Sequence, residues 1–293
     1  KSSEMKAQGI DVINMSVGEP DFMTPDHVKE AGKKAIDDNF SKYSPVPGYP
    51  VLREAIVKKL KQENHLDYAV SEIVVGTGGK QGVCNAILAL VNPGDEVIIP
   101  APYWVSYPQM VKLAGGVPVI VSAGIEQDFK ITAEQLEHAI TPKTKMIILC
   151  SPSNPTGSVY SAEELESLAK VVLAHDDLFV LSDEIYEHIN YIGGHCSIAS
   201  CQGMKDRTIL CNGVSKAYAM TGWRLGWIAA PEWIAKGINK LQGQYTSGTC
   251  SVSQMAAVAA YEADQACVAD YREAFRRRRD LIVRLAKGIP GLE

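Results

Sequence analysis

Short apolar runs, many of them rich in β-branched residues, recur along the chain and are separated by stretches in which apolar residues have helical spacing. Runs of this length, bounded by turn residues, are typical of buried β-strands. They are IVVG (73–76), EVIIP (96–100), VPVIV (117–121), KMIILC (145–150), LFVLS (178–182), TILC (208–211) and GWIAA (226–230). The pattern therefore predicts seven strands.

Helical spacing fills several of the gaps between these strands, over residues 80–91, 104–114, 132–140 and 161–174. The sequence SAEE predicts a capping box, in which Ser161 caps a helix and Glu164 reaches back to it. Residues after 230 are expected to be mostly helical. Strands that alternate with helices are typical of a parallel sheet covered on both faces. The expected fold class is therefore α/β, a three-layer α/β/α domain with a mainly parallel seven-stranded sheet.

Composition argues against some classes of partner. The chain has 293 residues, of which 46% are hydrophobic and 22% charged, and a net charge of −5. The negative charge argues against a nucleic-acid or anionic-membrane partner, and the one basic block, Arg276 to Arg279, is typical of a solvated helix face. No apolar run approaches the ~20 residues of a membrane helix. Seven cysteines without a C-x-x-C pair, and six histidines without ligand spacing, predict reduced thiols in a cytoplasmic protein that binds no metal.

Ligands of such folds gather in the loops beyond the carboxyl ends of the strands. Here these loops hold many of the glycine and polar residues, in GTGGKQG, APYW, SPSNPTG, SDEIY and NGVSK. The glycines of GTGGKQG let the backbone approach a ligand at the start of a helix, where free N–H groups suit a phosphate. Gln81 stands where a dinucleotide fingerprint needs glycine and a P-loop needs a hydroxyl residue, so neither motif is present. A plain strand-to-helix turn is the alternative.

Other side chains at this edge are candidates for chemistry. Asp183 ends an apolar strand, where a carboxylate is costly unless it is paired, for example with a protonated ring nitrogen; a helix N-cap is the alternative. Asn154 precedes Pro155 and is expected to be extended, either facing a pocket or in a polar turn. Lys216 can form a Schiff base if it is kept unprotonated, and Arg224 can bind a phosphate in a bidentate fashion.

Seven motifs occur in order along the chain, namely SVGEPDF, KYSPVPG, GGKQG, APYWVSYP, SPSNPTG, SDEIYE and NGVSKAYAMTGWRLG. Together they resemble the fold-type I aminotransferases that depend on pyridoxal 5'-phosphate (PLP), and within these the bacterial aspartate aminotransferases of the aspartate/prephenate subgroup. Each motif alone is unspecific, but seven in order are specific, and the resemblance covers nearly the whole chain. It implies the PLP-dependent transferase fold, with PLP as cofactor.

The resemblance implies a role for each matching residue. Lys216 would hold the cofactor as an internal aldimine and then move the proton of the substrate α-carbon. Asp183 would keep the pyridine nitrogen protonated, so that the ring can accept electrons, while Tyr186 and Asn154 would bind the phenolic oxygen and Trp104 would stack on the ring. The phosphate would be held by Gly79, Lys80, Ser215 and Arg224.

Further matches concern the substrate and a second subunit. Lys80 would recognise the distal carboxylate of aspartate or glutamate; the alternative is that only its backbone N–H contributes. Gly18 would lie against the substrate, together with Trp104 and Asn154. Tyr43 would reach the phosphate of the neighbouring subunit, which implies a homodimer with shared active sites. A core or surface tyrosine is the alternative for Tyr43.

Parts of the family pattern have no counterpart in the chain. The resemblance implies that residues 1–25 belong to a small domain, that residues 26–285 form the large PLP-binding domain, and that residues 286–293 begin the C-terminal part of the small domain. The arginine that clamps the substrate α-carboxylate in this family has no match. We therefore expect these residues alone to bind cofactor poorly or to turn over slowly.

The expected reaction is a ping-pong transamination. Aspartate or glutamate would give its amino group to the cofactor, through external aldimine, quinonoid and pyridoxamine phosphate forms, and a 2-oxo acid such as 2-oxoglutarate would take it. A prephenate aminotransferase, alone or bifunctional, is the nearest alternative. A carbon–sulfur lyase of the same fold and a non-catalytic ligand-sensing domain are more distant ones. A purely structural role would leave four polar residues at one sheet edge unexplained.

Overall fold

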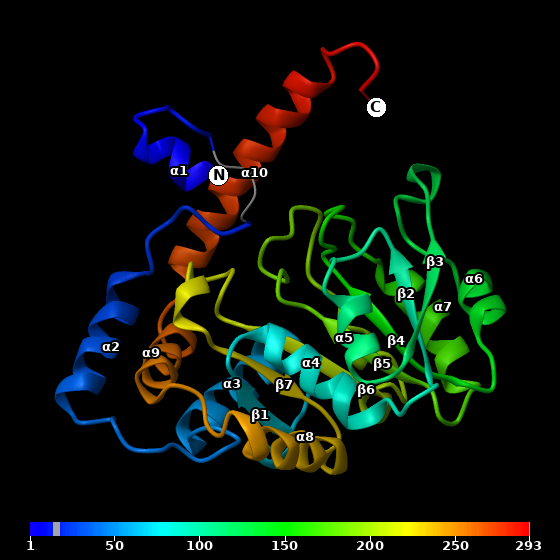
Figure 1. Cartoon of the computed structure of the whole chain (residues 1–293), viewed down its shortest axis with the longest axis horizontal. Helices are drawn as coiled ribbons and strands as arrows, with labels where there is room; N and C mark the ends of the chain where they lie inside the picture. Colours follow the sequence, from blue (N-terminus) through cyan, green and yellow to red (C-terminus); the bar gives the residue numbers. More distant parts are fainter. Residues whose placement is uncertain (14–17, 293) are drawn as a thin grey trace.

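The computed structural model describes residues 1–13 and 18–292, and it places one sheet between layers of helices (Figure 1). Each predicted strand is found within two residues of its predicted ends. The strands of the described residues are β1 Ile73–Gly76, β2 Glu96–Ala101, β3 Val117–Ser122, β4 Thr144–Cys150, β5 Phe179–Asp183, β6 Thr208–Gly213 and β7 Gly226–Ala229. Ser16 and Val17, which open the motif SVGEPDF, lie outside the described residues.

The seven strands form one sheet in the order β1-β7-β6-β5-β4-β2-β3. The pairs from β6 to β3 are parallel, and β7 is antiparallel to both of its neighbours. The prediction of a mainly parallel seven-stranded sheet is therefore confirmed. In register, Asp183 lies between Cys150 of β4 and Cys211 of β6. The loops after β4, β5 and β6 consequently leave the sheet at one edge.

The connecting segments are helical. The α-helices of the described residues are α1 Ser2–Ala7, α2 Asp26–Asp37, α3 Pro50–Glu63, α4 Gly79–Leu90, α5 Tyr107–Leu113, α6 Ala133–Ala139, α7 Ala162–Leu173, α8 Glu232–Tyr245, α9 Ser251–Glu262 and α10 Ala266–Ala286. Short 3-10 turns lie at Val70–Glu72, Ile125–Gln127, Ile198–Ser200, Lys205–Arg207 and Thr221–Trp223. The mostly helical region after residue 230 is confirmed.

Two details of the helix predictions can be judged. The capping box of α7 is confirmed, because the Ser161 hydroxyl accepts from the Glu164 N–H at 3.2 Å and the Glu164 carboxylate accepts from the Ser161 N–H at 2.7 Å. The predicted start of a helix at residue 104 is wrong, since α5 begins at Tyr107. Pro108 explains the later start, because a proline without an N–H is tolerated in the first turn of a helix and not in its interior.

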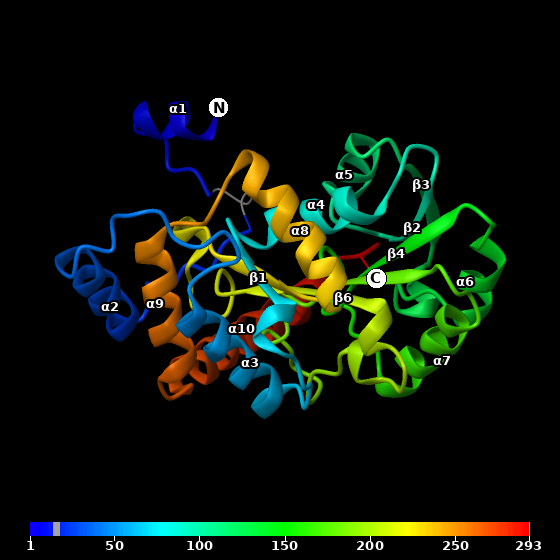
Figure 2. The same cartoon turned by 90° about the horizontal axis from the view of Figure 1, so that it is seen from below.

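Both faces of the sheet are covered by helices (Figure 2). Helices α4, α5 and α8 pack on one face, where Val74 points. Helices α3 and α9 pack on the other face, where Val75 points, and α6 and α7 continue this layer under β2, β4 and β5. Burial on both faces explains why the strands read as unbroken apolar runs. Among the described residues, no helix is both long and apolar enough to span a membrane.

Helix α10 extends beyond the three layers and holds the N-terminal segment (Figure 1). The basic block lies on a solvated face as expected, since Arg276, Arg277 and Arg278 are exposed. Arg278 also donates to Asp21 at 2.7 Å and lies 4.9 Å from the ring of Phe22. Phe22 in turn stacks on Tyr271 at 4.3 Å. One arginine of the block therefore fastens the segment that includes Gly18.

A close approach of backbones at Gly226 generates a prediction. Gly226 pairs with Gly76 and Gly213, and a Cβ there would touch the Gly79 nitrogen and lie 2.6 Å from the Gly78 carbonyl carbon. We expect Gly226→Ala to lower the free energy of unfolding by about 1–3 kcal/mol, because backbone must move to admit the methyl group. Denaturant unfolding measures this change.

The control is Gly237→Ala in α8, where a Cβ meets nothing within 4 Å. This change should be neutral or stabilise the protein by up to about 1 kcal/mol, because alanine favours a helix interior. Equal midpoints for the two variants would contradict the close approach at Gly226.

Candidate active site

A cavity of about 460 Å³ opens at the sheet edge where β4, β5 and β6 end. Its volume suits a small molecule such as a cofactor. It brings together every predicted site residue except Tyr43, namely Gly18, Gly79, Lys80, Trp104, Asn154, Asp183, Tyr186, Ser215, Lys216 and Arg224. Five further residues line it that the sequence did not single out, namely Glu19, Tyr107, Cys150, Ile185 and Thr221.

Asp183, the last residue of β5, places a buried carboxylate in this cavity. It accepts a hydrogen bond of 2.7 Å from the Tyr107 hydroxyl and one of 3.3 Å from the Ile185 N–H. Burial raises the pKa of Asp183, and these two hydrogen bonds oppose the rise. No helix follows directly, so the N-cap alternative is wrong. A cationic group of a ligand would stabilise this carboxylate.

Lys216 lies in the loop after β6, and its ammonium donates to the Gly18 carbonyl at 2.5 Å. The nitrogen is 5.6 Å from the centre of the Tyr186 ring. Burial lowers the pKa of Lys216, with a further contribution from Arg224, while Glu19 opposes the shift. The amine is thus deprotonated more readily than that of a surface lysine, as a nucleophile or proton carrier requires.

Asn154 and Tyr186 form a pair of donors. The Asn154 amide donates to the Tyr186 hydroxyl at 3.3 Å. Burial raises the pKa of Tyr186 to about 12, so the phenol keeps its proton at neutral pH. Both side chains line the cavity and can donate to a ligand oxygen.

Arg224 and the start of α4 make one end of the cavity positive. Gly78, the N-cap of α4, has φ +82°, and a Cβ there would lie 2.6 Å from an Arg224 nitrogen. Glycine therefore admits the guanidinium against the helix N-terminus, where N–H groups and the helix dipole favour an anion. Arg224 itself has φ +53°, an uncommon conformation for a non-glycine residue.

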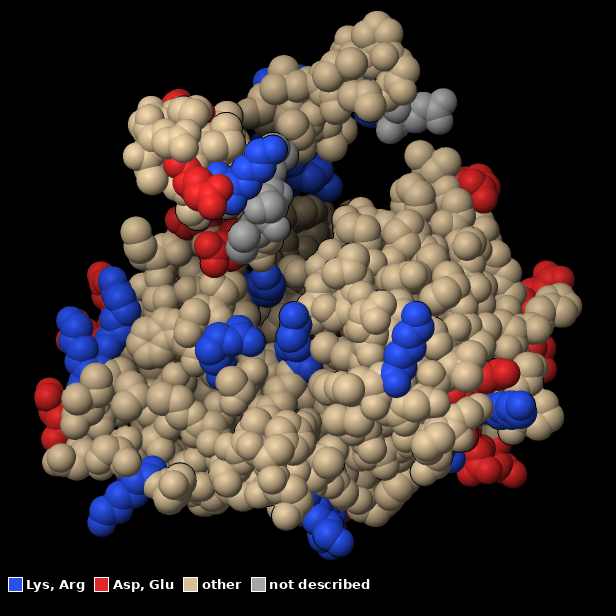
Figure 3. Space-filling model, in the orientation of Figure 1, with Lys and Arg blue, Asp and Glu red and all other residues tan. Residues whose placement is uncertain are grey.

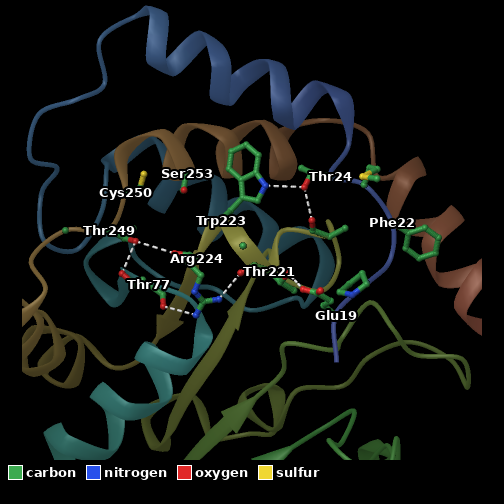
Figure 4. Close-up of a pocket in the computed structure, with 15 residues that line it drawn as sticks. Glu19, Phe22, Thr24, Thr77, Thr221, Trp223, Arg224, Thr249, Cys250 and Ser253 are labelled. Atoms are coloured by element: carbon green, nitrogen blue, oxygen red, sulfur yellow. Dashed lines mark hydrogen bonds between the residues drawn. The ribbon is translucent and has the colours of Figure 1, made fainter. Parts of the chain in front are cut away.

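A second hollow, of about 880 Å³, adjoins this end and is shown in Figure 4. The Thr221 hydroxyl donates to Glu19 at 3.1 Å. The Trp223 indole donates to the Thr24 hydroxyl at 3.2 Å. These bonds hold segment 18–24 against the loop that carries Arg224, so the N-terminal segment forms a wall of both hollows.

Lys80, the second residue of α4, is exposed and also lines the cavity. Its ammonium is 4.9 Å from the centre of the Trp104 ring, and Trp104 meets the ring of Tyr107 edge to face at 5.3 Å. Positive side chains gather in the middle of the face shown in Figure 3, where few acidic ones lie. A surface of this charge favours anions.

Tyr43 does not enter this cavity. Its side chain is 99% exposed. It lines another hollow, of about 930 Å³, together with residues 248–252. In this chain, Tyr43 is therefore neither a core residue nor a neighbour of Lys216.

Tyr107 is the most informative residue that sequence reasoning missed. It lies within the motif APYWVSYP, but only Trp104 of that motif was given a role. The contact between Tyr107 and Asp183 joins residues 76 positions apart, and no local pattern marks it. Cys150 was also missed; burial raises the pKa of its thiol to about 12, so it lines the cavity as an unreactive group.

The arrangement fits one kind of ligand. A buried carboxylate suits a protonated ring nitrogen, a guanidinium at a helix N-terminus suits a phosphate, and a lysine amine of lowered pKa suits an aldehyde. PLP combines these three groups. Residues 10–292 match the family described as aminotransferase class I and II. The chain belongs to this family, and it is an aminotransferase that uses PLP and acts on amino acids and oxo acids.

Individual relatives are similar over almost the whole chain. The aspartate/prephenate aminotransferase of Cereibacter sphaeroides is 51% identical over 99% of this chain and 74% of its own length. The aspartate aminotransferase of Rhizobium meliloti has a TM-score of 0.95 and 45% identity, over 99% of this chain and 73% of that chain. The Thermus thermophilus aspartate aminotransferase, solved with maleate, has a TM-score of 0.93 and 43% identity, over 97% of this chain and 74% of that chain.

The lowered pKa of Lys216 generates a prediction for protein freed of cofactor. The rate of PLP uptake should rise with pH as the amine loses its proton, with a midpoint below that of an ordinary lysine, because burial disfavours the ammonium form. Stopped-flow absorbance across a pH series measures this rate, and Lys216→Ala is the control for non-covalent binding. A midpoint at or above that of a lysine model amine would contradict the prediction.

Proposed function

We propose that this enzyme transfers an amino group from aspartate or glutamate to a 2-oxo acid such as 2-oxoglutarate, in two half-reactions. Bound PLP would supply an electron sink for the substrate α-carbon. The amine of Lys216, once released from the cofactor by the incoming amino acid, would take the α-proton. Its burial and its lowered pKa support this role.

The surrounding residues would hold the cofactor in the orientation that this proton transfer needs. Asp183 would pair with the ring nitrogen, Tyr186 and Asn154 would donate to the phenolic oxygen, and Trp104 would cover the ring face. The phosphate would be bound by the backbone of Gly79 and Lys80, the hydroxyl of Ser215 and the guanidinium of Arg224. A Cβ built at Gly18 meets nothing within 4 Å, which leaves the space that the substrate would take.

The position of the Lys80 ammonium supports the choice of substrate. Its ammonium stands beside Trp104 among the residues that line the cavity. A positive charge there favours a substrate with a second, distal carboxylate over one with an apolar side chain. The Thermus relative solved with maleate, a dicarboxylate, supports this choice.

Prephenate is the second candidate acceptor. The Cereibacter relative is named for both aspartate and prephenate, and prephenate also carries two carboxylates. Initial rates with prephenate, compared with 2-oxoglutarate and oxaloacetate at equal concentration, separate the two candidates.

The absorption spectrum of the complete protein tests the proposed reaction. Aspartate should change the visible band of the bound cofactor, and 2-oxoglutarate should restore it, because each substrate completes one half-reaction. A spectrum that aspartate leaves unchanged would reject aspartate as the donor. If Lys216→Ala still bound the cofactor covalently, the role given to Lys216 would be wrong.

We also propose that the enzyme is a homodimer in which Tyr43 binds the cofactor phosphate of the partner subunit. The outward direction of Tyr43 and the hollow beside it support an intersubunit role. Residues 1–25 and 286–293 would belong to a small domain, and residues 26–285 to the large one. The seven cysteines, all free in the structure, are compatible with a cytoplasmic enzyme.

Hybrid dimers provide the prediction for shared sites. Tyr43→Ala and Lys216→Ala proteins should each have low activity alone. After mixing and subunit exchange, activity should rise, because each hybrid contains one site with both Lys216 and the partner's Tyr43. Mixtures that stay as inactive as their components, although exchange is shown by mass spectrometry, would contradict shared sites.

Lys80 provides the prediction for specificity. Lys80→Met removes the charge and keeps the backbone N–H. We expect kcat/KM for aspartate to fall about 10- to 100-fold and kcat/KM for alanine to change less than about 3-fold. Lys170→Met, on the exposed side of α7, is the control and should change neither. An unchanged kcat/KM for aspartate would favour the alternative in which Lys80 contributes only its backbone, and equal losses for aspartate and alanine would reject a role of the side chain in specificity.

A further inference from the structure

Two carboxylates are buried behind the turn that carries the catalytic groups. Glu184 and Glu187 lie in the same turn as Asp183 and Tyr186, and their exposed fractions are only 1% and 7%. Neither residue lines the cavity. An unpaired buried carboxylate is strongly unfavourable, so the partners of these two groups indicate what the turn is fastened to.

Glu187 joins its own turn to two other parts of the chain. Its carboxylate accepts hydrogen bonds from the buried ammonium of Lys59 in α3, from the Asn64 amide at 2.8 Å and from the Asn212 amide at 2.7 Å. Burial alone would raise the pKa of Glu187, but Lys59 and two neighbouring histidines hold it below its usual range. Glu187 is thus a carboxylate with donors from α3 and from the end of β6.

Asn212 is the link from Glu187 to the loop that carries Lys216. Its amide nitrogen donates to Glu187, and its amide oxygen accepts from the Gly213 N–H at 2.7 Å. Asn212 is buried, and it lies in β6 four residues before Lys216. The direction in which the chain leaves β6 is therefore set partly by the position of the Glu187 carboxylate.

Glu184 fastens the other side of the same turn. It accepts from the Ser182 hydroxyl at 2.8 Å and from the Ser197 hydroxyl at 2.6 Å, and it pairs with His195 at 2.7 Å. Burial alone would lower the pKa of His195, but Glu184 and the other nearby carboxylate raise it above its usual value. Both ends of the turn are thus held from behind by buried polar contacts.

The same side chains bring together groups with metal-ligand chemistry. Ligand atoms of Glu184, Glu187 and His195 lie within 4.8 Å of one another. The Lys59 ammonium is already bound to Glu187 and supplies the positive charge that a metal ion would bring. The cluster therefore fits an internal ion-pair network better than a cation site.

We propose that Glu187 is a positioning residue, whose carboxylate holds Tyr186 and the loop of Lys216 in a fixed mutual placement by binding Asn212. The proposal rests on the proposed roles of Tyr186 and Lys216. Lys59 keeps the carboxylate ionised and in place, so its contribution is indirect. The 5.6 Å between the Lys216 nitrogen and the Tyr186 ring centre is the geometry that this link maintains.

Two double variants distinguish the effect of the hydrogen bond between Glu187 and Asn212 from the effect of the ion pair between Lys59 and Glu187. Lys59→Met with Glu187→Gln removes both charges but keeps an amide oxygen that can accept from Asn212. Lys59→Met with Glu187→Leu removes the charges and the acceptor. Neither leaves a buried charge without a partner, which would itself destabilise the fold. Asn212→Ala breaks the link and leaves the ion pair intact.

The readouts are the PLP dissociation constant and the pH midpoint of the visible absorption of bound cofactor, both measured on the complete protein. We expect the Gln variant to match the wild type. The Leu variant and Asn212→Ala should bind PLP about 10-fold more weakly and should shift the pH midpoint of the absorption. Losses of this kind are common when a group that orients the ligand-binding residues is removed. kcat should fall about 10- to 100-fold, with KM for aspartate changing less than about 3-fold.

Glu63→Gln is the matched control. Glu63 approaches Lys59 at 3.6 Å and His188 at 3.0 Å, and it lies outside the cavity. This change should leave cofactor affinity and spectrum at wild-type values. If the Leu variant and Asn212→Ala lost unfolding stability yet kept wild-type affinity and midpoint, Glu187 would be only structural and the proposal would be wrong. If the Leu variant failed to fold, Asn212→Ala alone would decide.

The spectroscopic readouts do not depend on the substrate. Failure of aspartate to react in the wild type would reject the proposed substrate. It would leave the comparison between the Gln and Leu variants, and hence the test of Glu187, intact.

Discussion

A carboxylate buried at the end of β5 is the constraint around which the site is organised. Asp183 lies between two cysteines in the sheet register, where no backbone or solvent compensates its charge fully. The Tyr107 hydroxyl and the Ile185 N–H stabilise it in part. Its remaining demand for a positive partner fixes which end of a ligand lies deep in the cavity. In the proposed complex, the orientation of PLP, and hence the atom presented to Lys216, would follow from that demand.

The opposite end of the cavity, at Arg224 and the start of α4, is positively charged. It depends on the close approach of backbone segments. Glycines at 78 and 226 allow a guanidinium, a helix N-terminus and three strands to meet without side chains between them. Arg224 adopts an uncommon backbone conformation to reach this place. Under the proposed function, a ligand with one cationic and one anionic end would therefore bind in a single direction, before any contact that selects a substrate is made.

Behind the cavity, the same turn that carries Asp183 is held by charges that never meet the ligand. Burying Lys59 with Glu187 costs desolvation of two ions, and such pairs contribute little net stability compared with an apolar pair of the same volume. The proposed value of the pair is directional, because the hydrogen bonds of a charged carboxylate have preferred geometries, whereas apolar contacts have none. A network of this kind suits a site in which proton transfer depends on small distances.

The sequence by itself determined the strands, helices α4, α6 and α7, the mostly helical region after residue 230, the α7 capping box and the loops that carry Asn154, Asp183, Lys216 and Arg224. These follow from local properties: apolar periodicity, capping residues, and the rule that loops after parallel strands share an edge. Only the tertiary structure decided that Tyr107 binds Asp183, that Lys59 and Asn212 meet at Glu187, that α5 starts late and that Tyr43 points outward. The contacts to Asp183 and to Lys59 join side chains 76 and 128 residues apart. A local sequence pattern cannot specify these contacts. Burial of a charged side chain requires a polar partner, but the packing of elements distant in the sequence determines which residue that partner is.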